Sequence, residues 1–83
     1  MQWKNYIQKQ ISMNLKSAYI ITAIRKFAEY FAISGSQAYK YLKNYSGINY
    51  LDECYEAEHQ LSFEDTVKDL VRVCQIHGGT LRL

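Results

Sequence analysis

Apolar side chains recur at helical spacing between residues 15 and 31. They lie three or four positions apart and share one helix face, at Ile20, Ile24, Phe27, Ala28 and Phe31. The charged positions fall on the opposite side, at Lys16, Arg25, Lys26 and Glu29. This stretch is predicted to form an amphipathic helix.

A second helix is predicted over residues 35–45. Ser34 precedes it as an N-cap, and Gln37 three residues later completes the sequence signature of a capping box. Its inward positions are Ala38, Tyr41, Leu42 and Tyr45. The helix is expected to end at Gly47, which can adopt the left-handed conformation typical of helix ends.

Two further helices follow. Asn49 is the expected N-cap of a short helix, with Asp52 and Glu53 in its first turn, where the helix dipole favours acidic side chains. The apolar stripe of this helix is Leu51, Cys54 and Tyr55. Ser62 caps the last helix, whose inward face consists of Phe63, Val67, Leu70, Val71 and Cys74 and which ends at the Gly78-Gly79 pair.

These patterns predict one all-α domain, a compact four-helix arrangement with short turns. Residues 1–14 form an N-terminal extension that is either helical or frayed, residues 15–79 the helical domain, and residues 80–83 a short tail. The 83-residue chain contains no proline, and its apolar runs are far shorter than a membrane span. We expect a cytoplasmic protein with reduced thiols.

Charge is distributed unevenly, although the net charge is only +2. Residues 1–33 contain five Lys or Arg and a single acid, whereas residues 49–66 contain six acids and no Lys or Arg. Such a charge separation can steer association with a charged partner or with a second copy of the chain.

Candidate chemistry is sparse. Cys54, His59, Cys74 and His77 are the only plausible zinc donors, but a five-residue separation on a helix places Cys54 and His59 on different sides. Both cysteines also fall on apolar stripes, where a free thiol packs as a small hydrophobic group. We therefore expect no metal, no cofactor and no catalytic site.

A helix-turn-helix is a second interpretation of residues 25–44, because two helical patterns meet there at a tight turn. The second helix would offer Gln37, Lys40 and Lys43 to a DNA major groove. The acidic segment that follows would repel phosphates unless it faced away.

Protein binding is the leading interpretation. Glu56 and Glu58 are not explained by helix capping and are expected to lie on an exposed acidic surface, which is either a solubilising face or a docking patch. Eight tyrosines are an excess for this length, and Tyr19, Tyr30 and Tyr39 fall off the inward stripes. Tyrosine is enriched at protein–protein contacts.

Four segments, residues 33–42, 47–51, 55–59 and 74–79, resemble a family of small bacterial helical proteins, Bacteroides-type members included, catalogued as a domain of unknown function. Members of that family are often encoded beside ADP-ribosyltransferase-like, toxin-type proteins. The resemblance implies an antitoxin-like or accessory protein and brings no catalytic residues. His59 matches the family's histidine, and is either functional or part of a buried network.

Overall fold

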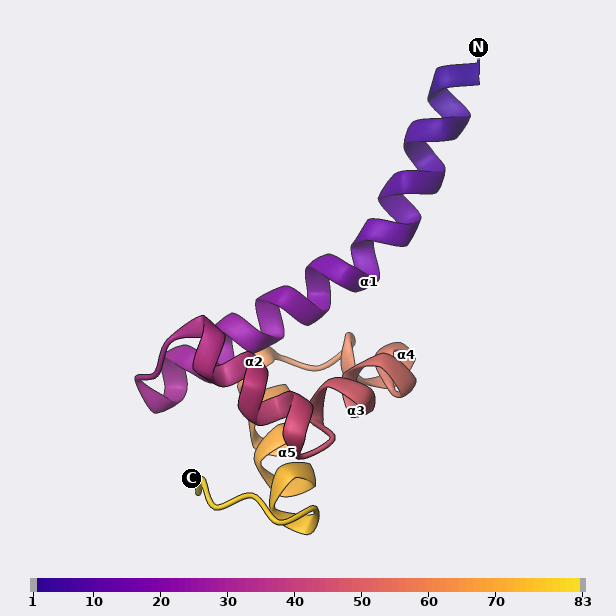
Figure 1. Cartoon of the computed structure of the whole chain (residues 1–83). Coiled ribbons are helices and arrows are strands. Elements are labelled where there is room, and N and C mark those ends of the chain that lie inside the picture. Colours follow the sequence, from indigo (N-terminus) through magenta and orange to yellow (C-terminus); the bar gives the residue numbers. More distant parts are fainter. Residues whose placement is uncertain (1, 83) are drawn as a thin grey trace.

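The computed structural model describes the backbone of residues 2–82 and the side chains of residues 15–82. Five helices follow one another in the order α1 (Gln2–Phe31), α2 (Gly35–Asn44), α3 (Gly47–Glu53), α4 (Tyr55–Glu58) and α5 (Phe63–Ile76) (Figure 1). The described residues contain no strand, and α4 is a single turn. The prediction of an all-α domain with four principal helices and short turns is confirmed.

Helix α1 is the longest element, and its second half packs against the other helices. Its N-terminal half runs away from them in Figure 1. The expected N-terminal extension therefore continues α1 in the backbone, whereas its side chains lie outside the described residues. No helix in the described part of the chain is both long and apolar enough to cross a membrane.

The core lies where α1, α2, α3 and α5 meet. Its largest fully buried apolar side chains are Phe27, Leu42, Leu51 and Leu70. Ala23, Ala28 and Ala38 are also buried, and these small side chains allow the helix backbones to approach closely. The predicted inward faces of α1, α2 and α5 thus form the core.

The first connection follows the sequence prediction in most details. Ala32 ends α1 in the left-handed region, with φ at 53°. Ser34 then caps α2: its hydroxyl accepts from the Gln37 N–H at 3.0 Å, while the Gln37 side-chain oxygen accepts from the Ser34 N–H at 2.9 Å. The predicted capping box is confirmed.

The α2–α3 connection differs from the prediction. The left-handed residue is Ser46, with φ at 68°, and Gly47 is the first residue of α3. A Cβ on Gly47 would lie 2.7 Å from Leu42 Cδ2 and 3.3 Å from Cys74 Sγ. Glycine is therefore needed here for close packing and not for its freedom at positive φ.

Because α3 begins at Gly47, Asn49 is not its N-cap. Asp52 and Glu53 lie at the C-terminal end of α3 and not in its first turn, so the helix dipole does not favour them there. Asp52 instead forms an ion pair of 2.8 Å with Lys16 of α1.

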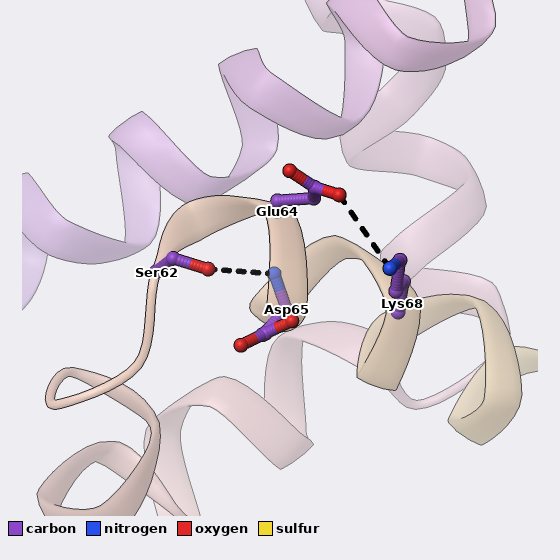
Figure 2. A network of polar contacts seen from close by, with 4 residues as sticks. All are labelled: Ser62, Glu64, Asp65 and Lys68. Carbon is purple, nitrogen blue, oxygen red and sulfur yellow. Dashed lines mark hydrogen bonds and ion pairs between the residues drawn. The ribbon is translucent and has the colours of Figure 1, made fainter.

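Helix α5 begins as predicted. The Ser62 hydroxyl accepts from the Asp65 N–H at 3.1 Å, and Glu64 pairs with Lys68 one turn further along at 3.5 Å (Figure 2). The helix ends at Ile76, and Gly78 takes the left-handed conformation with φ at 102°. The expected tail is attached to the domain, because the Leu81 N–H donates to the Tyr41 hydroxyl at 3.0 Å.

Candidate functional site

A buried carboxyl group is the most unusual polar feature of the described residues. Glu58, the last residue of α4, is only 3% exposed. Its Oε2 accepts a hydrogen bond of 2.6 Å from the Tyr50 hydroxyl of α3. Its Oε1 is buried and has no hydrogen-bond partner. Buried carboxyl oxygens without partners are costly and uncommon in native proteins.

Helices α5 and α1 complete the surroundings of this group. Asp69 and Thr66, both on α5, are the further polar neighbours of the Glu58 carboxyl. Thr66 is fully buried, and its hydroxyl shares a hydrogen bond of 3.1 Å with the hydroxyl of Tyr19 on α1. The network therefore connects four helices through Glu58.

The surroundings of Glu58 change the pKa of its carboxyl. Burial is the largest cause, and it raises the pKa of the Glu58 carboxyl above its ordinary value. The Tyr50 hydrogen bond opposes this rise, because it stabilises the carboxylate, whereas the adjacent Asp69 carboxyl adds to it. Burial also raises the pKa of Tyr50 itself, so its hydroxyl remains a donor.

The placement of Glu58 corrects the sequence interpretation. Glu56 is exposed as expected, but Glu58 is buried and cannot belong to the same acidic surface. The sequence contained a signal for this outcome, because Leu51, Cys54 and Glu58 are separated by three and four residues and so continue one inward stripe. Glu58 is buried because it occupies an apolar position of this stripe, although its charge predicts exposure.

His59 lies beside this network and is exposed. Its ring stacks on Tyr55, with ring centroids 4.6 Å apart, and its Nδ1–H donates to the Tyr55 carbonyl at 2.7 Å. Tyr55 in turn meets Tyr19 edge to face, and Tyr19 stacks on Phe63. His59 is thus held at the edge of an aromatic cluster that covers the buried carboxyl network.

The predicted acidic surface is smaller than expected. Glu58 is withdrawn into the interior, Asp52 is paired with Lys16, and Glu64 is paired with Lys68. The last of these pairs is the one drawn in Figure 2. Exposed pairs of this kind contribute little to stability, but they reduce the negative charge that a docking partner would meet.

The exposed tyrosines lie on α1 and α2 and not on the acidic segment. Tyr30 is 51% exposed and Tyr39 is 45% exposed, as their positions off the inward stripes predict. Lys43 Nζ lies 5.9 Å from the centre of the Tyr39 ring. Tyr19 differs from the prediction, because it is half-buried and packs against the core.

An open groove of about 560 Å³ lies along α1 and its turn into α2. Its lining is mostly apolar, and its residues are Ile21, Ile24, Arg25, Ala28, Glu29, Ala32, Ile33 and Gly35. Ile21 is 57% exposed at this groove. Solvent-exposed apolar side chains gathered in a concave surface are typical of binding sites.

The residues of the helix-turn-helix interpretation have mixed positions. Lys40 and Lys43 are exposed on α2, as that interpretation requires. Gln37 is exposed as well, but its side-chain oxygen is engaged in the capping box. The two lysines therefore have exposed functional groups, whereas Gln37 offers only its side-chain amide nitrogen to another molecule.

Cys54, Cys74 and His77 are the other candidate zinc donors named from the sequence. Cys54 and Cys74 are both free, and burial raises the pKa of the Cys74 thiol to about 11. The Nδ1–H of His77 donates to the Val73 carbonyl at 2.9 Å. Within the described side chains, no three His, Cys, Asp or Glu residues are grouped as they would be to hold a metal ion.

Fold and surface together define a small all-α domain with a buried carboxyl network and an open, mostly apolar groove along α1. The family model described as "Protein of unknown function (DUF3791)" matches residues 18–77, so the chain belongs to that family. The match covers α2 to α5 and the packed half of α1. No curated protein matches the chain. No solved structure matches it either.

Proposed function

We propose that the protein is a non-enzymatic module that binds another protein through α1 and α2. The observation that carries the proposal is the open apolar groove lined by the exposed Ile21 of α1, together with the exposed Tyr30 of α1 and Tyr39 of α2, which lie outside the groove. Tyrosine supplies large contact area together with a polar tip, which suits a surface that is hydrated when free and buried when bound.

The contact surface differs from the one that charge alone suggested. The acidic segment presents fewer free carboxylates than its sequence implies, since Glu58 is buried and Asp52 is paired. The groove and the exposed tyrosines are therefore the primary contact in this proposal. Glu56 and His59 of the α4 segment are exposed and form a secondary one.

The proposed partner is a toxin-type enzyme with an ADP-ribosyltransferase-like fold, encoded next to this protein, which would make the chain its antitoxin-like or accessory partner. The family resemblance supports this choice of partner, and the uneven charge of the chain suits electrostatic steering of a charged partner. A homo-oligomer formed through the same groove is the competing occupant.

The test begins with co-purification of the tagged protein from its native host and identification of the retained protein by mass spectrometry. Affinity is then measured by calorimetry with the purified partner. Truncation of an interface anchor costs about 2 kcal/mol or more, so Ile21→Ala should weaken binding at least about tenfold. Ile76→Ala on α5 is the matched control, because Ile76 is 75% exposed and does not line the groove.

Two results would contradict the proposal. One is an unchanged affinity of the Ile21→Ala variant, which would remove the groove from the interface. The other is retention of no protein from the host together with a monomeric mass in solution, which would leave the groove without an occupant.

DNA binding is the second candidate, favoured by the exposure of Lys40 and Lys43 on the helix that follows a three-residue turn. Selective retention of a DNA sequence from the protein's own promoter at physiological salt, abolished by Lys40→Glu with Lys43→Glu, would place this function first. We expect instead weak binding to any duplex, lost at moderate salt, because the net charge is only +2.

A further inference from the structure

The buried carboxyl of Glu58 has one oxygen satisfied and one bare. Oε2 accepts from the Tyr50 hydroxyl at 2.6 Å, whereas Oε1 has no donor, and Asp69 is a close polar neighbour. Two ionised carboxylates cannot donate to each other and repel in a buried setting. A proton on Glu58 removes both difficulties, because a protonated carboxyl donates to a neighbouring carboxylate.

The groups that face Glu58 come from three other helices. They are Tyr19 of α1, Tyr50 of α3, and Asp69 and Thr66 of α5. None of them carries positive charge. None of the ion pairs among the described residues includes Glu58 either. Neutralisation by a cation is therefore not what allows this carboxyl to be buried.

We propose that Glu58 is the proton-binding group of a pH-sensitive latch that holds α4 against the core. When the proton is present, the neutral Glu58 carboxyl accepts from Tyr50 and its O–H is directed toward the polar neighbours on α5, so α4 stays closed over the core. When the proton leaves to solvent, a buried negative charge remains with one oxygen unpartnered, and α4 separates from the core so that the Glu58 carboxylate can reach water.

The position of α4 makes such a release feasible without unfolding of the domain. It is a four-residue helix, and it lies between Cys54 and the residue 59–62 connection. One helical turn has almost no stability of its own, so its position depends on its side-chain contacts. Release would move the exposed Glu56 and His59, which flank Glu58, while the core formed by α1, α2 and α5 stayed closed.

The direction of the pH effect follows from the pKa of Glu58. Burial raises this pKa above the ordinary value of 4.5, so the folded state binds the proton more tightly than the unfolded state. The stabilisation is therefore complete below pH 4.5 and is lost as the pH rises through the pKa of the folded state. Closure of α4 is therefore favoured at pH values below the pKa of Glu58 in the folded protein.

The direct test is a carbon-13 NMR titration of the side-chain carboxyls in the intact protein. Glu58 should titrate at a higher pH than Glu56, the exposed glutamate of the same helix turn, which serves as the internal control. Two variants should move the Glu58 midpoint in opposite directions. Asp69→Asn should lower it, because a negative neighbour is removed, and Tyr50→Phe should raise it, because a donor to the carboxylate is removed.

The movement of α4 is tested by amide hydrogen exchange across the same pH range, corrected for the intrinsic exchange rate. Amides of residues 55–61 should lose protection as the pH rises, while those of the α5 core do not. In Glu58→Gln, which keeps the shape and cannot ionise, this change with pH should be absent. A Glu58 midpoint equal to that of Glu56, or loss of α4 protection with pH that persists in Glu58→Gln, would overturn the proposal.

Discussion

Replacement of Gly47 by alanine tests the close packing at the turn between α2 and α3. A Cβ at this position would lie 2.7 Å from Leu42 Cδ2, 3.2 Å from Leu42 Cβ and 3.3 Å from Cys74 Sγ. Leu42 and Cys74 are both fully buried, so neither can yield without displacing other core side chains. The added methyl must therefore shift α3 or strain Leu42.

The size of the effect follows from two opposing contributions. Overpacking a well-filled core costs about 1–3 kcal/mol. Alanine in place of a helical glycine recovers up to about 1 kcal/mol of backbone entropy. We expect Gly47→Ala to lower the free energy of unfolding by about 1–2 kcal/mol, and each kcal/mol lowers Tm by roughly 4–8 °C in a domain of this size.

The assay is urea denaturation followed by circular dichroism, with Gly35→Ala as the matched control. Gly35 is also the first residue of its helix, but a Cβ there would meet no atom within 4 Å. Gly35→Ala should therefore leave the protein equally stable or stabilise it by up to about 1 kcal/mol. If Gly47→Ala were as stable as Gly35→Ala, the packing argument for Gly47 would be refuted.

Three further changes have expected outcomes. Ala32→Gly should stabilise the protein by up to about 1 kcal/mol in urea denaturation, because Ala32 has a φ of 53°; destabilisation would contradict the strain argument. Ser62→Ala should destabilise by about 1 kcal/mol through loss of the α5 cap, whereas Ser62→Asp should retain stability. Cys74 should react with a thiol reagent far more slowly than Cys54 in the folded protein and at a similar rate in urea, because burial raises its pKa to about 11; equal folded-state rates would contradict its burial.

Local signals in the sequence were sufficient where a helix boundary is decided by its own residues. Ser34 and Ser62 cap the helices that follow them, as their side chains and spacing predict. The inward faces of α1, α2 and α5 were also predictable, because burial follows the helical period in long amphipathic elements. These elements define most of the fold.

The errors occur where tertiary contacts override the local signal. A glycine after a helix predicts a left-handed helix end. At position 47, however, glycine is needed because Leu42 and Cys74 approach too closely for a Cβ. Ser46 takes the left-handed conformation instead. The register of α3 then shifts, which moves Asp52 and Glu53 away from the first turn. Short helices are the elements whose boundaries local propensity decides least.

The burial of Glu58 could not be derived from charge, because ionised carboxyls are almost always exposed. Its helical spacing from Leu51 and Cys54 predicts a buried side chain, whereas its charge predicts an exposed one. The conflict is resolved only by groups distant in sequence, since Tyr50 supplies a donor and Asp69 a neighbouring carboxyl. Sequence spacing alone does not bring these groups together.

The chemistry of position 58 distinguishes a structural role from a switching one. A leucine there would fill the same register position without an unpaired oxygen, and replacement of buried polar groups by apolar ones is often neutral or stabilising. A carboxyl with a bare Oε1 is thus a poor choice if stability alone matters. What a carboxyl adds is a contribution that changes with pH, which no apolar side chain provides. In the proposed latch, the proton on Glu58 couples the exposed Glu56 and His59 on either side of it to Tyr50 in α3.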